Sequence, residues 1–428
     1  MNGDKLSGKI GILVGGGPAP GINGVIHSVT IAAITNGLEV VGIYEGFKHL
    51  MEGRLNDKPL TIKDVSRIHL DGGSILRTSR ANPTKTDALL RNCITALMNA
   101  GISNLIGIGG DDTAYSLSKM ADYARRAIGI PIRVVHVPKT IDNDLPLPEG
   151  IPTFGYETAR DLGTRIVMTF MEDAKTSGQH WFLVVTMGRK AGHLALGIGK
   201  SSGATLTLIP EEWRGQPIRL QEVVDILTTA ILLRLADGKS YGVALIAEGI
   251  IEHLRDDDLK TLGLGQRDEY GNLWLADVNF GDAIKRMLAQ DLKALGVTVK
   301  LVDKELGYEL RCAAPIAYDI DYTRSLGEAA VYFLLAGGSN ASISLQRNQA
   351  VPIPFEEMIN PQTGRTSVRM VNVDSFTYRS AYKFMIRLKP QHAEDDLFLA
   401  RMAMQTNLTL DAFKARYGYL IGLAPRPS

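Results

Sequence analysis

Residues 132–144 read IRVVHVPKTIDND, and this stretch decides the expected fold. Its first half is apolar, rich in β-branched residues and closed by a proline, which is typical of a buried parallel strand. Its second half places a lysine, a threonine and two aspartates directly behind that strand. In an open α/β sheet, ligands bind in the loops that leave the carboxyl ends of the strands. The stretch therefore predicts a parallel sheet, with chemistry on an anionic substrate and a metal at residues 138–144.

Similar apolar runs alternate with amphipathic stretches along the chain, which indicates repeated βαβ units. Strands are expected at 9–14, 39–44, 104–108, 132–137, 181–186, 205–209, 242–247 and 297–302. Helices are expected at 22–35, 87–100, 113–127, 156–173, 220–235, 280–295 and 323–336, and after residue 392. The predicted fold class is α/β, with two similar Rossmann-like three-layer lobes, mostly parallel sheets and a cleft between them. We expect lobes at 1–150 and 151–318, and a C-terminal extension of helices at 319–428 that packs back on both.

The composition excludes several classes of protein. In the 428 residues, 47 Lys and Arg balance 46 Asp and Glu. A net charge of +1 gives no bulk attraction to nucleic acid or to an anionic membrane, so any anion site must be local. The two cysteines, Cys93 and Cys312, form no CxxC motif, which argues against a disulfide framework and a structural zinc site. The chain starts without a signal-peptide pattern and lacks a run of about 18 apolar residues, so we expect a soluble, cytoplasmic protein.

Two glycine-rich turns follow expected strands. Residues 15–23 read GGGPAPGIN, where glycines let the backbone approach an anion and the next helix offers unpaired N–H groups. This is not the dinucleotide motif GxGxxG, because Pro20 stands at its last glycine, and a plain β-to-α turn is the alternative. Residues 109–113 read GGDDT, where Asp111 is a candidate ligand of Mg²⁺. The alternative there is that Asp112 or Thr113 simply caps a helix.

The loop at 138–144 carries the candidate catalytic groups. Asp142 is the candidate general base, and Asp144 is a second acid near the metal. Thr140 can hold a substrate oxygen, and Lys139 can neutralise charge on a transferring phosphoryl group. The alternative is a turn in which Asp and Asn serve the backbone only.

Further candidate binding residues lie elsewhere in the sequence. In MGRKAGH, residues 187–193, flanking glycines fit a turn that points Arg189 at an anion. Glu248 ends another expected strand, where it can accept sugar hydroxyl groups or be merely structural. Tyr308 and Arg311, three residues apart, can grip a phosphate. The GGSILRTSR stretch at 72–80 holds two arginines that can supply charge, of which we expect one to be only a surface residue.

Taken in order, the motifs GGGPAPGIN, GGSILRTSR, GGDDT, PKTIDND, MGRKAG, AEG and YELR resemble the phosphofructokinase family. The ATP-using branch of that family generally has glycine where this chain has Asp112 and Lys139, so the chain resembles the pyrophosphate-dependent branch. Asp112 would place charge and bulk where the α-phosphate and nucleoside of ATP must lie. Lys139 would compensate the compact charge of pyrophosphate. The resemblance implies reversible phosphoryl transfer from pyrophosphate to the 1-hydroxyl of fructose 6-phosphate with Mg²⁺, in glycolysis or gluconeogenesis.

The resemblance also implies a role for each candidate residue. Asp142 would be the base with Thr140 beside it, Asp111 would bind Mg²⁺ with Asp144 in support, and Gly16 and Arg80 would contact pyrophosphate. Met187, Gly188, Arg189 and Glu248 would surround the sugar, while Tyr308 and Arg311 would hold its 6-phosphate. The first lobe would then carry the phosphoryl donor and Mg²⁺, and the second the sugar phosphate. A homodimer or homotetramer without nucleic-acid or membrane partners is expected.

Three alternatives compete with this interpretation. An ATP-dependent phosphofructokinase would have to tolerate both Asp112 and Lys139. A non-catalytic regulatory subunit that binds sugar phosphate would be expected to lack the base, yet Asp142, Asp111 and Arg189 are present. A dinucleotide-binding oxidoreductase lacks support because no GxGxxG occurs. The physiological direction and activity on sedoheptulose 7-phosphate stay open.

Overall fold

The computed structural model describes residues 8–129, 131–264 and 279–423 and divides into two compact units. The first unit comprises Met1–Ala159 and Tyr308–Arg369, and the second comprises Arg160–Gly307 and Met370–Ser428. Each unit is thus assembled from two separated parts of the chain. This division differs from the expected boundaries, because residues 308–318 group with the first unit and the C-terminal extension is shared between both.

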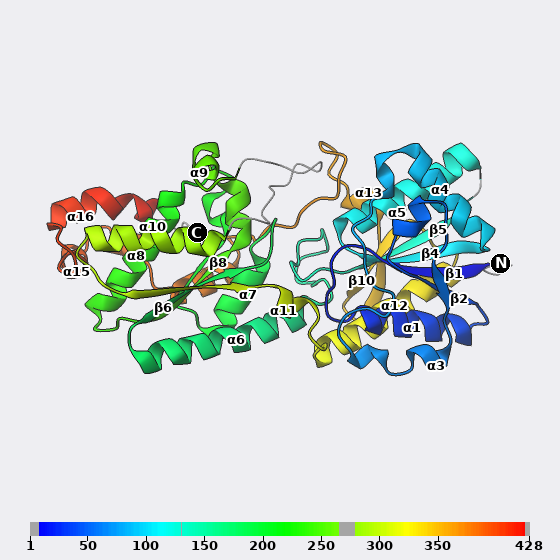
Figure 1. Ribbon diagram of the computed structural model, residues 1–428, viewed down its shortest axis with the longest axis horizontal. Coiled ribbons are helices and arrows are strands. Elements are labelled where there is room, and N and C mark those ends of the chain that lie inside the picture. The colour runs from blue at the N-terminus through cyan, green and yellow to red at the C-terminus, as the bar shows by residue number, and fades with distance from the viewer. Residues whose placement is uncertain (1–7, 130, 265–278, 424–428) are drawn as a thin grey trace. The chain divides into compact units, whose positions relative to one another are not determined.

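The sheet of the first unit contains β1 (Lys9–Val14), β2 (Val40–Ile43), β3 (Asp57–Pro59), β4 (Ile102–Gly109), β5 (Arg133–Pro138), β10 (Ala341–Gln346) and β11 (Gln349–Pro354). Their order is β11-β10-β5-β4-β1-β2-β3 (Figure 1). The five strands from β10 to β2 in that order pair in parallel, and the two edge strands pair antiparallel. The predicted mostly parallel sheet is confirmed.

Helices cover both faces of this sheet. They are α1 (Ile22–Thr35), α2 (Lys48–Met51), α3 (Ile62–Val65), α4 (Asp87–Asn99), α5 (Asp111–Tyr123), α11 (Tyr308–Arg311), α12 (Ala317–Leu335) and α13 (Phe355–Met358). Ile10, Ile12 and Val14 of β1 pack into one core with α1 and α12, whereas Leu13 packs into a second core with α4 and α5. Successive strand residues point to opposite faces, and fully burying each of these side chains contributes about 1.5–3 kcal/mol. The alternation yields the predicted three-layer α/β/α arrangement.

The later part of the chain returns to the first unit through close helix packing. A Cβ at Gly24 of α1 would lie 2.2 Å from Thr323 Oγ1, and one at Gly327 of α12 would lie 2.0 Å from Ser28 Oγ. Only glycine allows this approach at both places. Beyond α12, β10 pairs with β5 and turns back at Arg347 and Asn348, whose φ angles of 49° and 61° suit a two-residue hairpin.

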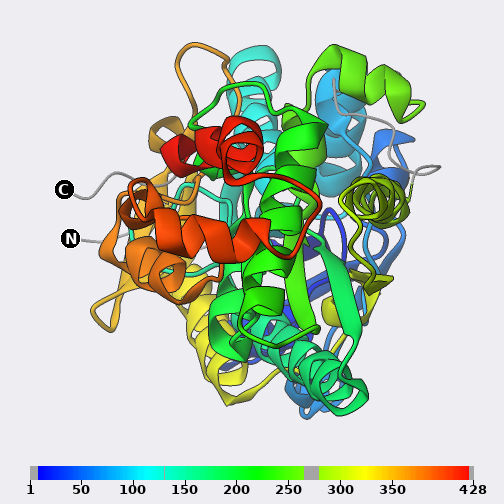
Figure 2. The same ribbon diagram turned by 90° about the vertical axis from the view of Figure 1, so that its left-hand side faces the viewer.

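The sheet of the second unit contains β6 (His180–Thr186), β7 (Leu206–Leu208), β8 (Gly242–Ala247) and β9 (Lys300–Leu306), in the all-parallel order β7-β8-β6-β9. The remaining helices are α6 (Tyr156–Ser177), α7 (His193–Ser202), α8 (Leu220–Ala236), α9 (Asp256–Thr261), α10 (Phe280–Ala294), α14 (Phe376–Phe384), α15 (Asp396–Ala403) and α16 (Leu410–Tyr417). Alternate β6 residues such as Trp181 face the core made with α8 and α10, while Phe182 stacks on Phe170 of α6 at 5.2 Å. Among the C-terminal helices, which are coloured orange to red in Figure 2, α15 packs against α8.

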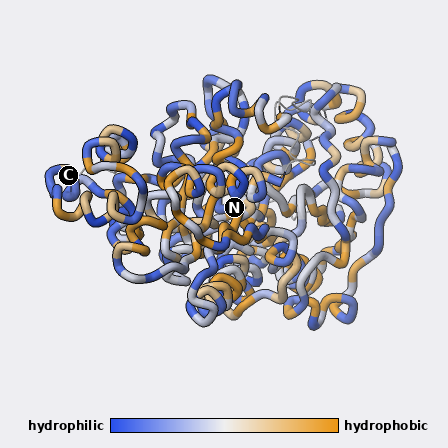
Figure 3. Tube along the Cα trace, turned by 60° about the vertical axis from the view of Figure 1, so that its left-hand side comes forward, coloured by the Kyte–Doolittle hydropathy of each residue, from blue (hydrophilic) through white to orange (hydrophobic). Residues whose placement is uncertain are grey.

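Hydrophobic stretches run through the packed elements, while hydrophilic residues dominate many outer turns (Figure 3). Strands Lys9–Val14 and Gly242–Ala247 and helix Ile22–Thr35 have the predicted bounds. Helix α7 was not predicted, and α5 begins two residues earlier than expected. Within the described part of the chain, no helix combines the length and hydrophobicity needed to span a membrane.

Candidate active site

The turn after β1 brings backbone close to a lysine from another strand. Gly16 has a φ of 80°, a left-handed conformation that favours glycine, and its N–H donates to Ser79 O at 2.9 Å. A Cβ at Gly16 would lie 3.1 Å from the Nζ of Lys139. That Nζ also donates a hydrogen bond to the carbonyl of Gly17. The backbone of the glycine turn therefore packs directly against the Lys139 ammonium.

Lys139 is the charged centre of the first unit's candidate site. Its side chain follows β5 and is only 4% exposed. The pKa of Lys139 is lowered to about 8, mainly by burial and then by the nearby positive charges of Arg311 and Arg80, against the raising effects of Asp142 and Asp111. These electrostatic partners come from four separate predicted motifs. The structure thus brings the motifs of the first unit together around one ammonium group.

Arg311 lies beside the glycine turn. A Cβ at Gly17 would be 2.2 Å from Arg311 Nη2, so a side chain there would displace the guanidinium. The guanidinium carbon also lies 5.2 Å from the ring centre of Tyr308, which is itself 80% exposed. Arg311 was expected on the second lobe with the sugar phosphate, whereas the structure places it in the first unit, next to the turn expected for pyrophosphate.

The GGDDT motif forms the start of α5. Gly110 occupies the N-cap position and no side chain caps the helix, so capping does not account for Asp112 or Thr113. Asp111 is the first helical residue, and its Oδ1 accepts the backbone N–H of Asp112 at 2.9 Å. Asp112 is exposed. Both carboxylates therefore lie in the first turn, where the helix dipole stabilises negative charge.

The loop at 138–144 is held in shape by internal and distant contacts. Thr140 Oγ1 accepts the backbone N–H of Asp142 at 3.0 Å, which fixes the two candidate catalytic residues relative to each other. Asn143 has a left-handed φ of 56°. Arg369 donates to the carbonyls of Asn143 at 2.9 Å and Ile151 at 2.7 Å. Sequence reasoning missed Arg369, because nothing near it in the sequence marks it as a support for a loop more than 200 residues away.

Asp144 lies next to the same arginine. Its carbonyl accepts the backbone N–H of Arg369 at 2.8 Å. Burial lowers the pKa of Arg369, and the negative charge of Asp144 opposes that shift. The expected role of Asp144 beside the metal stays a prediction.

The carboxylates present fit a Mg²⁺ ion that is bound largely through substrate phosphates. Among residues 8–129, 131–264 and 279–423, no group of three or more His, Cys, Asp or Glu side chains is arranged to hold a metal. Mg²⁺ usually keeps several waters and binds through one or two carboxylates plus substrate phosphate oxygens, so it does not require such a cage. Asp111, which acts electrostatically on Lys139, is the carboxylate that can supply such a ligand, and the supporting role expected of Asp144 stays a prediction.

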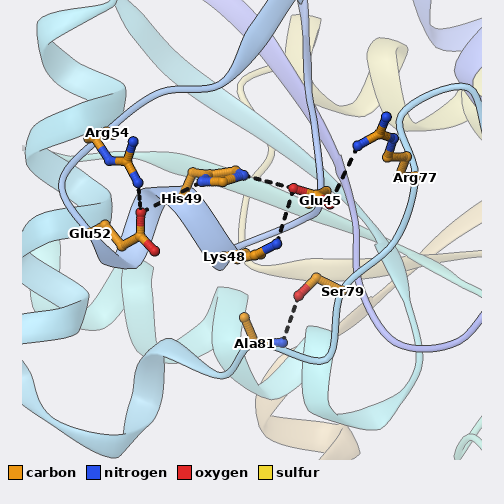
Figure 4. Close-up of polar contacts among 8 residues, drawn as sticks. All are labelled: Glu45, Lys48, His49, Glu52, Arg54, Arg77, Ser79 and Ala81. Carbon is orange, nitrogen blue, oxygen red and sulfur yellow. Dashed lines mark hydrogen bonds and ion pairs between the residues drawn. The ribbon is translucent and has the colours of Figure 1, made fainter.

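The structure separates the roles of the two arginines in the 72–80 stretch. Arg77 points at Glu45, with Nη1 3.6 Å from Oε1, and its side chain is 71% exposed (Figure 4). Glu45 also accepts from His49 Nε2 at 2.8 Å and pairs with Lys48 at 3.4 Å. Both arginines are exposed, and Arg77 is the one that forms a surface ion pair with Glu45. Arg80 is the one whose charge acts on Lys139.

In the second unit, the 187–193 loop meets the segment after β8. Met187 N–H donates to Leu306 O at 3.0 Å, and Gly188, with a φ of 134°, accepts from Gly249 N–H at 3.0 Å. Glu248 begins a short 3₁₀ helix, Glu248–His253. The structure thus brings the four expected sugar-binding residues, Met187, Gly188, Arg189 and Glu248, onto two adjoining segments.

Two glutamates that sequence reasoning missed support this loop. Arg189 Nη2 lies 3.2 Å from Glu252 Oε1. The buried Glu211 accepts the backbone N–H of Gly192 at 2.9 Å, and burial raises the pKa of its carboxyl group. The sequence signal for Glu252 was its position four residues after Glu248. Glu211 gave none, since an acid in a turn is usually exposed.

Comparison with known proteins agrees with the resemblance that the sequence motifs indicate. Residues 9–334 match the family model described as phosphofructokinase. The chain is 48% identical over 418 residues to the pyrophosphate–fructose 6-phosphate 1-phosphotransferase of Thermotoga maritima, covering 96% of this chain and 98% of that one. A crystal structure of the pyrophosphate-dependent phosphofructokinase from Nitrosospira multiformis superposes with a TM-score of 0.69 at 17% identity, covering 89% of this chain and 92% of that one. Pichia pastoris phosphofructokinase in the T-state gives a TM-score of 0.67 at 22% identity, covering 98% of this chain but only 39% of that longer one.

Proposed function

The chain belongs to the phosphofructokinase family, and we propose that it transfers a phosphoryl group reversibly between pyrophosphate and the 1-hydroxyl of fructose 6-phosphate. The observation that carries the choice of donor is the position of Lys139. Its buried ammonium rests on Gly16 and Gly17, with Arg80 close enough to act on its charge. A compact, highly charged anion such as pyrophosphate suits this concentration of positive charge.

The carboxylate of Asp112 disfavours a nucleotide as the phosphoryl donor. Asp112 lies exposed in the first turn of α5, one residue after Asp111. In the resemblance described above, this position faces the α-phosphate and nucleoside of ATP. A carboxylate there repels an additional phosphate, while pyrophosphate ends before reaching it. Asp112 and Lys139 together support pyrophosphate over ATP.

Asp142 is the proposed general base. Its carboxylate accepts the proton of the 1-hydroxyl, whose oxygen attacks one phosphorus of pyrophosphate. A P–O bond to the sugar forms, the bridging P–O bond breaks, and its electron pair leaves with inorganic phosphate. Thr140 fixes the backbone of Asp142 and presents its hydroxyl to the transferring group. Lys139 and Arg80 stabilise the negative charge that spreads over that group.

Mg²⁺ is the proposed cofactor, and it would offset the charge of the pyrophosphate oxygens when bound. Asp111 is the proposed ligand, with Asp144 in support. We assign Gly16 to pyrophosphate as well, because it lies in the turn that contacts the Lys139 ammonium.

Residues of the second unit are proposed to recognise the sugar. Arg189 is braced by Glu252, and Met187, Gly188 and Glu248 lie on the adjoining segments described above. Tyr308 and Arg311, which belong to the first unit, are proposed to hold the 6-phosphate. By resemblance to the family we further propose a homodimer or homotetramer. Since phosphorylated sugars do not cross membranes unaided, we propose a cytoplasmic location.

Fructose 1,6-bisphosphate formation from fructose 6-phosphate and Mg²⁺, with either pyrophosphate or ATP, tests the proposal. Turnover with pyrophosphate alone is expected. Turnover with ATP alone would contradict the donor assignment of Asp112 and Lys139. If neither donor worked while fructose 6-phosphate still bound, the chain would be a regulatory subunit instead.

A further inference from the structure

A buried histidine on β5 joins two of the loops in the candidate site. His136 is fully buried, and its Nε2 lies 2.8 Å from the carbonyl oxygen of Gly109 at the end of β4. Its Nδ1 lies 2.9 Å from the hydroxyl of Ser342 on β10, which is also fully buried. Neither residue has a role in the reaction proposed above, yet both are polar groups kept inside the sheet.

The hydrogen-bond partners of His136 determine which of its ring nitrogens carries the proton. A carbonyl oxygen can only accept, so Nε2 carries the proton and donates it to Gly109. Nδ1 then holds a lone pair, which accepts the hydroxyl hydrogen of Ser342. Burial lowers the pKa of His136 to about 4, so the ring is neutral at pH 7. The hydrogen bonds therefore run in one direction, from Ser342 through His136 to Gly109.

The Gly109 carbonyl connects the GGDDT loop to the PKTIDND loop. It also accepts the backbone N–H of Lys139 at 2.8 Å. Gly109 directly precedes Gly110, the N-cap of α5, so the carbonyl's position sets where Asp111 begins the helix. We propose that His136, oriented by Ser342, is a positioning residue that fixes this carbonyl and so aligns Asp111 and Lys139 for Mg²⁺–pyrophosphate. This proposal rests on the function proposed above.

Removing the hydrogen bond that His136 donates is expected to weaken the binding of pyrophosphate but not that of fructose 6-phosphate. The Gly109 carbonyl loses the histidine donor but keeps the backbone N–H of Lys139 as its second donor. We therefore expect His136→Leu to raise KM for pyrophosphate about tenfold, the factor that 1.4 kcal/mol represents. KM for fructose 6-phosphate is expected to stay within about twofold, because the lost hydrogen bond touches only the GGDDT and PKTIDND loops.

Three further variants separate positioning from general loss of stability. His136→Gln places an amide N–H where Nε2 was and is expected to restore most of the pyrophosphate KM. Ser342→Ala removes the orienting hydroxyl and is expected to raise KM for pyrophosphate about threefold, the effect of one ordinary hydrogen bond. Ser344→Ala is the matched control, since Ser344 is a fully buried serine on the same strand that donates to Val351 O at 2.8 Å instead. It is expected to lose similar thermal stability without a change in either KM.

Two readouts do not depend on turnover. Nitrogen-15 spectra of the histidine rings should show His136 as the Nε2–H form from pH 6 to 8. The backbone amide signal of Lys139 should shift in His136→Leu and return in His136→Gln. Equal changes in both KM values, failure of Gln to restore the pyrophosphate KM, or an unmoved Lys139 amide would overturn the proposal. Absence of pyrophosphate turnover in the unaltered protein would refute the proposed function, while the amide and tautomer measurements would still judge the role of His136.

Discussion

Replacing Lys139 with methionine should stabilise the protein without its ligands. The pKa of Lys139 is lowered from 10.5 to about 8 because the ammonium is buried and faces Arg311. At 1.36 kcal/mol per pH unit, holding this charge in the folded state costs about 3 kcal/mol. Below pH 8 the lysine is protonated in both the folded and unfolded states, so the full cost is present. Lys139→Met keeps the side-chain length without the charge and should recover about 3 kcal/mol at pH 7.

The pH dependence supplies the sharper test. Between pH 8 and 10.5 the unfolded state binds more protons at this lysine than the folded state, so stability of the unaltered protein should rise with pH across that window. The variant should lack this rise. Urea unfolding at pH 7, 8, 9 and 10 measures both effects, with Lys63→Met, an exposed lysine on α3, as the control. Parallel stability curves for the unaltered protein and Lys139→Met would refute the assignment of a strained, buried ammonium.

Further predictions concern the reaction and the second unit. Asp142→Asn should lower turnover about 10²–10⁴-fold while fructose 6-phosphate binding, measured by calorimetry, survives; unchanged turnover would remove Asp142 as the base. Arg80→Gln should raise KM for pyrophosphate, whereas Arg77→Gln should change it little because Arg77 is held by a surface ion pair; equal effects would contradict this division. Arg387→Met should destabilise the protein by about 3–5 kcal/mol in urea unfolding, because it removes the ion-pair partner of Glu212, whose side chain is only 2% exposed. Adding Glu212→Gln should recover much of that loss, and a fully additive double variant would show that the two groups are not coupled.

Local sequence patterns predicted the α/β fold class and the approximate positions of many of its strands and helices. Apolar runs closed by glycine or proline located the strands, because a buried parallel strand must be apolar on both faces. The glycines after β1 and β4 were predicted to lie near a ligand for backbone reasons, and the structure gathers them with Lys139. Residues that follow a strand end in the sequence also lie beside that strand end in space, so motifs at strand ends could be placed from the sequence alone.

The parts that sequence reasoning missed depend on contacts between distant residues. Nothing in residues 308–369 alone shows that they return to the first unit, because that follows from β10 pairing with β5 and α12 packing on α1. Arg311 was assigned to the other lobe for this reason. Arg369 lies in a stretch that also contains Arg365, and its use appears only when its guanidinium meets the carbonyls of the 143–151 loop.

The burial of Lys139 links stability to donor choice. An ammonium pressed against Gly16 and Gly17 and facing Arg311 is unfavourable while the site holds no anion. Pyrophosphate would reverse that balance, since each added negative charge favours the protonated lysine and raises its pKa toward or above the ordinary value. Binding at pH 8 to 9 should therefore take up a proton, which calorimetry in buffers of different ionisation enthalpy can measure. No uptake in the unaltered protein, or equal uptake in Lys139→Met, would mean that Lys139 does not contact the donor, and the argument for pyrophosphate over ATP would lose its main support.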